Sequence, residues 1–336
     1  MLTDDKRARL RDGLVIPAHP LALTADRTLD EPRQRALTRY YAAAGAGGVA
    51  VGVHTTQFEI RDHDLYEPVL RMAAEESGPD AVLVAGVLGP TESAVTEAKI
   101  AAGLGYDLAL VATPGWGDAT DDEILAGVAA VAEVLPVFGF YIQPALGKRR
   151  FGFDFWRRYA QIPGVAAIKV APFDRYATLD VVRAVVEAGR SDDIALYTGN
   201  DDNIVADLVT PYRFGGRTVH IVGGLLGQWA VWTPAAVALH AEVRRMVRAG
   251  GPVPLDLLAR GAELTDANAA VFDVANRFVG SIAGVNEVLT RDGLLAGNWC
   301  LADHERLSPG QSDEITRVVR DHPDVVAVPA PRPGNP

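Results

Sequence analysis

The sequence VAAIKVAPFDR, residues 165–175, contains one lysine inside an apolar run that has the composition of a buried strand. An ordinary lysine at a strand end extends its ammonium group into water. Lys169 instead stands between Ile168 and Val170, and desolvation at the carboxyl end of a buried strand favours the neutral, nucleophilic amine. Such an amine can attack a carbonyl group and form a Schiff base. The stretch therefore predicts a buried strand that carries a reactive lysine.

Seven further apolar runs of similar length flank this strand. They are residues 13–18, 47–53, 81–88, 107–112, 136–142, 194–199 and 217–224. Helical signals stand between them, such as Asp30 as an N-cap with Pro32 in the first turn, and a TDDE capping box at 120–123. Strands that alternate with helices form a parallel sheet, and eight such units in about 240 residues fit an α/β fold of the (β/α)₈ barrel type. A doubly wound dinucleotide fold fits less well, because no G-x-G-x-x-G opens a helix after the first strand.

The pattern changes after the eighth unit. GGPVP at 250–254 ends the alternation, and helical patterns follow as far as residue 321. We therefore expect a barrel domain over residues 1–250 and a helical region over residues 251–325 that packs on the barrel. The proline-rich end, residues 326–336, is expected to be disordered.

The composition excludes several classes of partner. The formal charge of −11 and the pI near 5.1 argue against nucleic-acid and anionic-membrane binding, because both require a basic face. No apolar run reaches the roughly 18 residues that a membrane helix needs. The first 13 residues have no apolar signal region, and the single Cys300 cannot form an internal disulfide. We predict a cytoplasmic protein that binds neither nucleic acid nor membrane.

In a (β/α)₈ enzyme the residues that follow each strand surround the active site. A Schiff-base enzyme needs an amine, a group that carries protons, and small donors for a carboxylate. Residue types of these kinds stand at or near the predicted strand ends, beside Lys169. The candidates are Thr55, Thr56, Trp116, Tyr141, Gly199, Asp201 and His220.

The order and spacing of these residues resemble the dihydrodipicolinate synthase and N-acetylneuraminate lyase family of class I aldolases, over about residues 13–320. The similar segments are HTTQF at 54–58 (the family has G-T-T-G-E), YIQP at 141–144 (Y-N-x-P), AIKVAPFD at 167–174 and TGND at 198–201. The separation of Tyr141 and Lys169, 28 residues, is the family's.

The resemblance implies a role for each matching residue. Lys169 would form the Schiff base with a 2-oxo acid such as pyruvate, and Tyr141 would carry protons. The backbone N–H groups of Thr55 and Thr56 would bind the carboxylate, and the Thr55 hydroxyl would orient Tyr141. The resemblance also implies a homo-oligomer, a dimer or tetramer, and it implies no cofactor or metal.

Five positions depart from the family pattern. Leu146 stands where the synthase branch has an arginine for the carboxylate of its second substrate. Trp116 replaces a second tyrosine, and it either lines an apolar acceptor pocket or packs in a core or interface. His220 replaces an apolar residue, and it is either an extra acid or base or a histidine satisfied by backbone groups. His54 and Gln57 replace two glycines of the threonine loop.

These observations predict a Schiff-base lyase or aldolase that joins or cleaves a 2-oxo acid and an aldehyde, or eliminates water from such an adduct. Trp116 and Phe173 favour an apolar acceptor, whereas Asp201 and Asp202 favour a polyol. Two alternatives remain open, a catalytically silent barrel that binds a 2-oxo or sugar acid as a sensor, and dihydrodipicolinate synthase proper. A metal-dependent phosphate-binding barrel ranks last, because Asp201 and Asp202 are the only obvious carboxylate pair.

Overall fold

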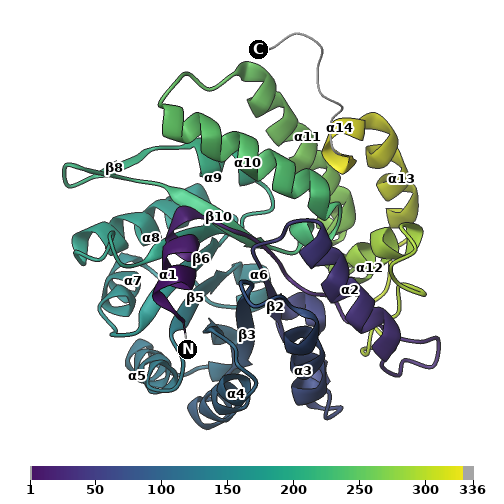
Figure 1. The fold of residues 1–336 in the computed structure, drawn as a ribbon, viewed down its shortest axis with the longest axis horizontal. Helices are drawn as coiled ribbons and strands as arrows, with labels where there is room; N and C mark the ends of the chain where they lie inside the picture. The colour runs from purple at the N-terminus through teal and green to yellow at the C-terminus, as the bar shows by residue number, and fades with distance from the viewer. Residues whose placement is uncertain (1, 328–336) are drawn as a thin grey trace.

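A barrel of parallel strands forms the centre of the computed structural model, which describes residues 2–327 (Figure 1). Its strands are β1 (Val15–Pro17), β2 (Gly48–Val51), β3 (Val82–Leu88), β4 (Leu108–Ala112), β5 (Val137–Ile142), β6 (Val165–Ala171), β7 (Ala195–Thr198) and β10 (Ile221–Leu226). Their order in the sheet is β1-β10-β7-β6-β5-β4-β3-β2. A parallel bridge between Ala18 and Ala50 joins β1 to β2, and the His19 N–H donates to the Ala50 carbonyl at 2.8 Å. The barrel is therefore nearly closed, and the predicted (β/α)₈ fold is confirmed.

The first seven predicted strand runs each contain a barrel strand, but the eighth is divided. Arg217–Val219 form β9, which pairs with β8 (Tyr212–Phe214) in an antiparallel hairpin. Gly215 and Gly216 turn this hairpin with φ of 55° and 76°, a conformation that glycine adopts without steric cost. The barrel strand begins only at Ile221, so His220 precedes it instead of lying within it.

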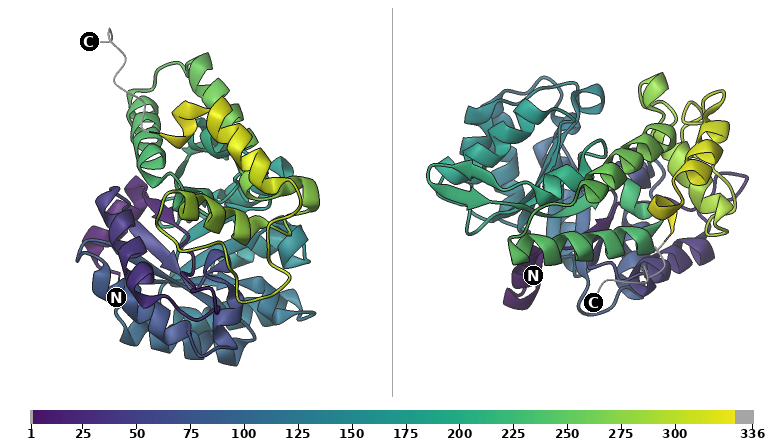
Figure 2. Two further views of the ribbon diagram at one scale, coloured as in Figure 1. Left: turned by 90° about the vertical axis from the view of Figure 1, so that its right-hand side faces the viewer. Right: turned by 90° about the horizontal axis from the view of Figure 1, so that it is seen from above.

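Helices cover the outside of the barrel (Figures 1 and 2). They are α2 (Glu31–Ala43), α3 (Tyr66–Glu76), α4 (Thr91–Gly103), α5 (Asp121–Ala132), α7 (Phe153–Ala160), α8 (Arg175–Glu187), α9 (Ile204–Val209) and α10 (Thr233–Ala249), with the short α6 (Pro144–Gly147) directly after β5. Two predicted caps form: Asp30 accepts from the Arg33 N–H at 3.2 Å, and Thr120 and Glu123 make the capping box. None of the helices within residues 2–327 is long and apolar enough to cross a membrane.

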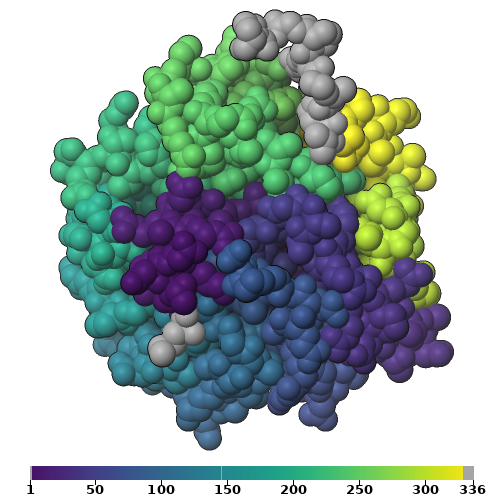
Figure 3. Space-filling model, in the orientation of Figure 1, coloured from purple at the N-terminus to yellow at the C-terminus, as the bar shows by residue number. Residues whose placement is uncertain are grey.

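The amino-terminal helix α1 (Asp4–Asp12) lies across the amino end of the barrel, where its purple surface covers the centre of the face shown in Figure 3. The Tyr197 hydroxyl, inside the barrel, donates to the Leu10 carbonyl at 2.7 Å and accepts from the Leu14 N–H at 3.1 Å. Helix α1 therefore closes the amino end of the barrel, and the carboxyl end is open to a ligand.

Side chains alternate between the two faces of each strand, and this alternation decides which of them face the inside. In β5, Phe138 and Phe140 join the apolar cluster inside the barrel, whereas Val137 and Tyr141 pack outward against the helices. Parallel pairing sets Phe140 beside Lys169 of β6. Lys169 therefore faces the interior of the barrel.

The carboxyl-terminal helices lie together on one side of the molecule (Figure 2). They are α11 (Leu255–Val271), the short η5 (Val274–Asn276), α12 (Ser281–Arg291), α13 (Gln311–Asp321) and α14 (Pro323–Val326). Asn268 near the end of α11 donates to the Asp201 carbonyl at 2.7 Å, which ties this region to the loop after β7. The division into domains at residue 250 stays a prediction. Val326 belongs to α14, and residues 328–336 of the expected disordered tail lie outside the described residues.

Candidate active site

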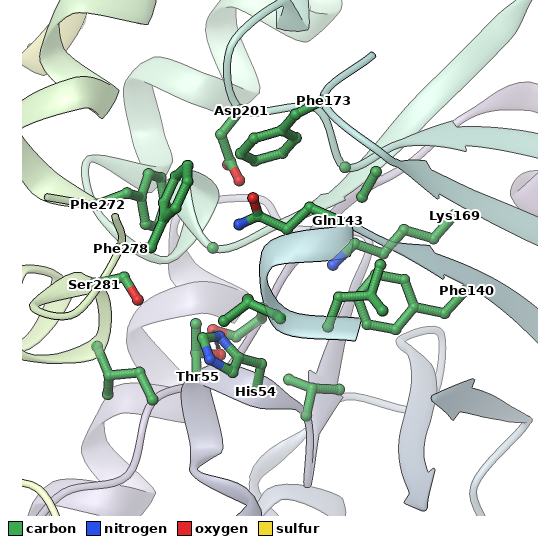
Figure 4. Close-up of a pocket in the computed structure, with 18 residues that line it drawn as sticks. His54, Thr55, Phe140, Gln143, Lys169, Phe173, Asp201, Phe272, Phe278 and Ser281 are labelled. Atoms are coloured by element: carbon green, nitrogen blue, oxygen red, sulfur yellow. Dashed lines mark hydrogen bonds between the residues drawn. The ribbon is translucent and has the colours of Figure 1, made fainter. Parts of the chain in front are cut away.

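A pocket opens at the carboxyl ends of the barrel strands (Figure 4). Its space, including the open mouth, is about 660 Å³. Five of the predicted site residues line it: Thr55, Leu146, Lys169, Gly199 and Asp201. Four others do not, namely Thr56, Trp116, Tyr141 and His220.

Lys169 reaches the pocket from β6, and only 9% of its surface is exposed. Its Nζ lies 4.2 Å from the centroid of the Phe140 ring, an attractive contact for an ammonium group. A Cβ at Gly199 would lie 2.4 Å from the Lys169 Cε, so this glycine leaves room for the lysine side chain. Burial lowers the pKa of Lys169, and the nearby Asp201 opposes this effect in part. The amine therefore becomes neutral, and nucleophilic, more readily than that of a lysine in water.

Asp201 lies in the loop between β7 and α9, and its carboxyl group points into the pocket (Figure 4). Its Oδ1 accepts from the Gln228 N–H at 3.4 Å. Burial raises the pKa of this carboxyl group, and Lys169 opposes that rise. Among the pocket residues that the structure describes, Asp201 and Lys169 are the only aspartate, glutamate, lysine or arginine.

The threonine loop is a short 3₁₀ turn, η1 (His54–Thr56), directly after β2. The Thr55 hydroxyl lines the pocket and donates to the Ala18 carbonyl at 2.8 Å, so it does not orient Tyr141. The Thr56 hydroxyl donates to the His19 carbonyl at 2.6 Å, and the Thr56 N–H donates to the Val53 carbonyl at 3.0 Å. Thr56 is fully buried outside the pocket. The prediction that Thr56 binds a carboxylate is corrected, because its N–H group is bonded to Val53 and its hydroxyl is bonded to His19.

His54 lines the pocket beside Thr55, where its ring packs edge-on against Phe58 with centroids 5.8 Å apart. Burial, with a smaller contribution from the Lys169 charge, lowers the pKa of His54 to about 4. The imidazole is therefore neutral near pH 7. In the sequence, His54 stands in place of a glycine of the threonine loop, and this replacement alone does not indicate that its ring lines the pocket.

Tyr141 does not reach the pocket. Its hydroxyl donates to the Phe151 carbonyl at 3.0 Å and accepts from the Phe151 N–H at 3.2 Å, and its ring packs on Trp156 with centroids 5.0 Å apart. Phe140, the preceding residue, takes the inward position opposite Lys169. The pairing of β5 with β6 shifts between Val137 and Phe138, and a shift of one residue reverses the face that each side chain occupies. The prediction of Tyr141 as proton relay is therefore corrected.

Trp116 also lies away from the pocket. It ends the 3₁₀ turn η3 (Thr113–Trp116) after β4, and its Nε1 donates to the Thr91 hydroxyl at 3.3 Å. A Cβ at Gly89 would lie 2.4 Å from the Trp116 ring, and one at Gly127 would lie 2.8 Å from it. The tryptophan fills the space between these two glycines, so its predicted contact with substrate is corrected to a packing role.

His220 lies at the opposite end of the barrel from Lys169. It precedes β10 and borders a surface hollow that Asp192 and Arg244 also line. Burial and the charge of Arg244 lower its pKa. The predicted place of His220 beside the substrate is corrected, because the eighth barrel strand begins after this residue.

An apolar wall completes the pocket. Phe173 follows β6, while Phe272, Phe278 and Ile282 come from the carboxyl-terminal helical region. The rings of Phe173 and Phe278 meet edge-on at 5.8 Å, and both residues have positive φ, 52° and 68°. Non-glycine residues in this conformation cost roughly 1–3 kcal/mol each and persist only where neighbouring contacts hold them. Of these four, sequence reasoning singled out only Phe173.

A buried carboxylate holds the Phe173 side of this wall. The Phe173 N–H donates to the Asn200 Oδ1 at 2.9 Å, and the Asn200 Nδ2 donates to the Asp207 carboxylate at 2.8 Å. Asp207 is fully buried and also accepts from the Thr198 hydroxyl at 2.7 Å. The loops after β6 and β7 are thus joined behind the pocket.

The (β/α)₈ barrel, with a buried lysine in the pocket at the carboxyl ends of its strands, is compatible with the class of Schiff-base aldolases and lyases. Residues 13–222 match the model of the Dihydrodipicolinate synthetase family, and the chain belongs to this family.

Its similar relatives include different lyases. The chain is 29% identical over 214 residues to the N-acetylneuraminate lyase of Citrobacter koseri, covering 62% of this chain and 70% of that protein. It is 27% identical over 240 residues to the 4-hydroxy-tetrahydrodipicolinate synthase of an Exiguobacterium species, covering 66% and 78%. A probable 5-dehydro-4-deoxyglucarate dehydratase of Streptomyces coelicolor is 28% identical over 196 residues, covering 57% and 58%.

Solved structures show the same fold. A dihydrodipicolinate synthase of Bacillus anthracis superposes with a TM-score of 0.76 at 18% identity, over 92% of this chain and 97% of that one. A prophage protein of the dihydrodipicolinic acid synthase family from E. coli K12, solved in complex with pyruvate, superposes with a TM-score of 0.75 at 17% identity, over 92% and 98%.

Proposed function

We propose that the chain is a lyase that forms a Schiff base between Lys169 and a 2-oxo acid, and that it makes or breaks a bond between this acid and an aldehyde. The observation that carries the proposal is the position of Lys169, which is buried near the carboxyl end of β6 and lines the pocket there. Family membership supports it, and a solved neighbour of the same fold binds pyruvate. The protonated imine withdraws electrons from the adjacent carbon, which lowers the barrier to carbanion formation.

Polar groups on the other side of the pocket suit the carboxylate of a 2-oxo acid. Thr55 and Ser281 line the pocket, as does Gln143, whose amide points toward its centre (Figure 4). A backbone N–H, a hydroxyl and an amide are the donors that a small carboxylate requires. We place the carboxylate between Thr55 and Ser281, with the 2-oxo carbon beside Lys169.

The aldehyde that we propose is apolar. Leu146, Phe173, Phe272 and Phe278 line the rest of the pocket, and Lys169 is the only lysine or arginine among its described residues. A carboxylated aldehyde would therefore lose a charge-assisted contact worth on the order of 2–3 kcal/mol. Dihydrodipicolinate synthase proper is the weaker alternative for this reason.

One observation favours a second candidate function, the catalytically silent barrel that binds a 2-oxo acid as a sensor. Tyr141, the expected proton carrier, is bonded to Phe151 outside the pocket. A barrel without any proton carrier would bind the acid and would not turn it over.

Reductive trapping tests the proposal. Borohydride with pyruvate should add one three-carbon unit to the peptide that contains Lys169, measured by mass spectrometry. The Lys169→Ala variant should take up none, whereas Lys99→Ala, which removes an exposed lysine, should label normally. Calorimetric binding of pyruvate without trapping would favour the sensor, and labelling of another lysine would contradict the proposal. The homo-oligomer stays a prediction, which light scattering on the purified chain tests.

A further inference from the structure

The pocket needs a proton carrier in place of Tyr141. Imine formation, enamine formation and carbon–carbon bond formation each move a proton to or from an atom next to Lys169. The pocket offers two titratable side chains besides the lysine, namely His54 and Asp201.

We propose that Asp201 is the catalytic group that carries protons to and from the Lys169 imine. This inference rests on the proposed function and adds a residue to it. Lys169 lies on β6 and Asp201 lies in the loop that follows the neighbouring strand β7, and both side chains point into the pocket (Figure 4). Gly199 stands between them and lets the lysine side chain pass.

Contacts from two other elements hold Asp201 in place. The Gln228 N–H donates to its Oδ1, and Asn268 donates to its carbonyl. No ion pair within 4.0 Å joins Asp201 to Lys169 in the described residues, so a substrate carbon bound to the lysine can lie between the two groups. The Asp201 carboxyl group is therefore held by a hydrogen bond, and it is not engaged in a salt bridge with Lys169.

The environment of Asp201 suits proton transfer better than that of His54. The charged groups that act on Asp201 are Lys169 across the pocket and Asp202 beside it, which in turn faces Arg175 at 3.8 Å. Burial raises the pKa of Asp201 toward the working pH, whereas it lowers the pKa of His54 to about 4. A base of such low pKa is weak, and a group whose pKa lies near the working pH is the more efficient carrier.

Each proton and electron pair has a place in this scheme. When Asp201 is protonated and Lys169 is neutral, the Lys169 amine forms a bond to the carbonyl carbon of pyruvate, and a proton passes from nitrogen to oxygen. Asp201 then protonates the carbinolamine hydroxyl, which leaves as water while the nitrogen lone pair forms the C=N bond. The Asp201 carboxylate next removes a proton from C3, the C–H electron pair becomes the C=C bond of an enamine, and the C=N π pair returns to nitrogen. As C3 bonds to the aldehyde carbon, the nitrogen lone pair forms the C=N bond again and Asp201 returns this proton to the aldehyde oxygen. Water then hydrolyses the C=N bond, which releases the product and the free amine.

Deuterium exchange at C3 of pyruvate tests this role without knowledge of the aldehyde. In D₂O the wild-type protein should exchange the methyl protons of pyruvate, followed by proton NMR, above the rate of Lys169→Ala. Asp201→Asn should slow this exchange roughly 10²- to 10⁴-fold, the usual scale for loss of an acid–base group, while borohydride still traps the imine. Asp201→Glu should restore part of the rate, and Asp192→Asn, a control at the opposite end of the barrel, should exchange like wild type.

The pH profile gives a readout that a merely structural role would not change. At saturating pyruvate the lysine is already an imine, so the rise of the exchange rate with pH reports ionisation of Asp201. This rise should lie above the ordinary range of an aspartate, and it should disappear in Asp201→Asn.

The outcomes separate the two proposals. Normal trapping with unchanged exchange in a folded Asp201→Asn variant overturns this inference and leaves the Schiff base standing. Loss of exchange in His54→Asn but not in Asp201→Asn also overturns it, in favour of the histidine. Absence of trapping in the wild-type protein overturns both proposals.

Discussion

The two halves of the pocket differ in origin and in chemistry. The barrel supplies the groups that can react or bind polar atoms: Lys169, Asp201, His54, Thr55 and Gln143. The carboxyl-terminal helical region supplies Phe272, Phe278 and Ile282, with Ser281 as its one polar contribution. Under the proposed function, the barrel would set the reaction, and the added helices, together with Leu146 and Phe173 of the barrel, would set the choice of aldehyde. Four substitutions test this division, from the largest expected effect to the smallest.

Gly199→Ala should damage the barrel half most. Gly199 has no positive φ, so the effect comes from contact: the new Cβ would lie 2.4 Å from the Lys169 Cε and 2.7 Å from the Ala171 Cβ. Displacement of the amine by about 1 Å costs roughly 10²-fold in rate. Imine trapping should slow by at least this factor, whereas Gly103→Ala, where a Cβ meets nothing within 4 Å, should leave it unchanged. Normal imine trapping in Gly199→Ala would contradict the close contact between position 199 and the Lys169 side chain.

Phe278→Ala should weaken only the apolar half. Loss of a buried phenyl contact costs about 1.5–3 kcal/mol, which corresponds to a rise of roughly 10- to 100-fold in KM for an aromatic aldehyde. Pyruvate trapping should stay at the wild-type rate. Val279→Ala, at the neighbouring position with 55% of its surface exposed, is the control. An equal loss for aromatic and for small polar aldehydes would contradict the division between the halves.

Tyr141→Phe should change stability and spare the chemistry. The substitution leaves the Phe151 N–H and carbonyl groups without their buried partner, which lowers the free energy of unfolding by about 1–3 kcal/mol. Denaturant unfolding measures this loss, and C3 exchange at saturating pyruvate should match wild type. Tyr176→Phe, where 81% of the residue is exposed, should alter neither quantity. A fall in exchange without a fall in stability would return the proton relay to Tyr141.

His220→Gln should have the smallest effect. The residue lies at the amino end of the barrel, so trapping and exchange should stay within about twofold of wild type, as for a substitution remote from the site. A dependence of turnover on this histidine would mean that the two ends of the barrel are coupled.

The sequence was sufficient for the barrel and for the part of the site that lies on strand ends. Alternating strand and helix patterns give the fold, and an apolar strand with one lysine gives Lys169. Gly199 and Asp201 follow from their places after a strand, and Leu146 follows from the family resemblance, as the residue in place of an arginine. Each of these patterns involves residues that are close together in the sequence, so one sequence is enough to detect them.

The remaining features depend on contacts that no local pattern encodes. The spacing between Tyr141 and Lys169 does not reveal the shift in strand pairing that turns Phe140 inward instead. The start of β10 at Ile221 depends on the preceding hairpin, which removes His220 from the site. Phe272 and Phe278 reach the pocket only because the helices after residue 250 fold back over the barrel, more than 100 residues after Lys169.

The threonine turn after β2 also forms the seam where the barrel closes. Thr55 and Thr56 bond to the carbonyl groups of Ala18 and His19, next to the bridge that joins β1 to β2. A ligand that contacts Thr55 would therefore stabilise the contact between the first and second strands. Saturation with a 2-oxo acid should slow amide hydrogen exchange at His19, whose N–H crosses this seam to Ala50, more than at strands remote from it. The amide exchange rate at His19 would thus report whether the pocket is occupied, because a bound ligand would make local opening of the barrel between β1 and β2 less frequent.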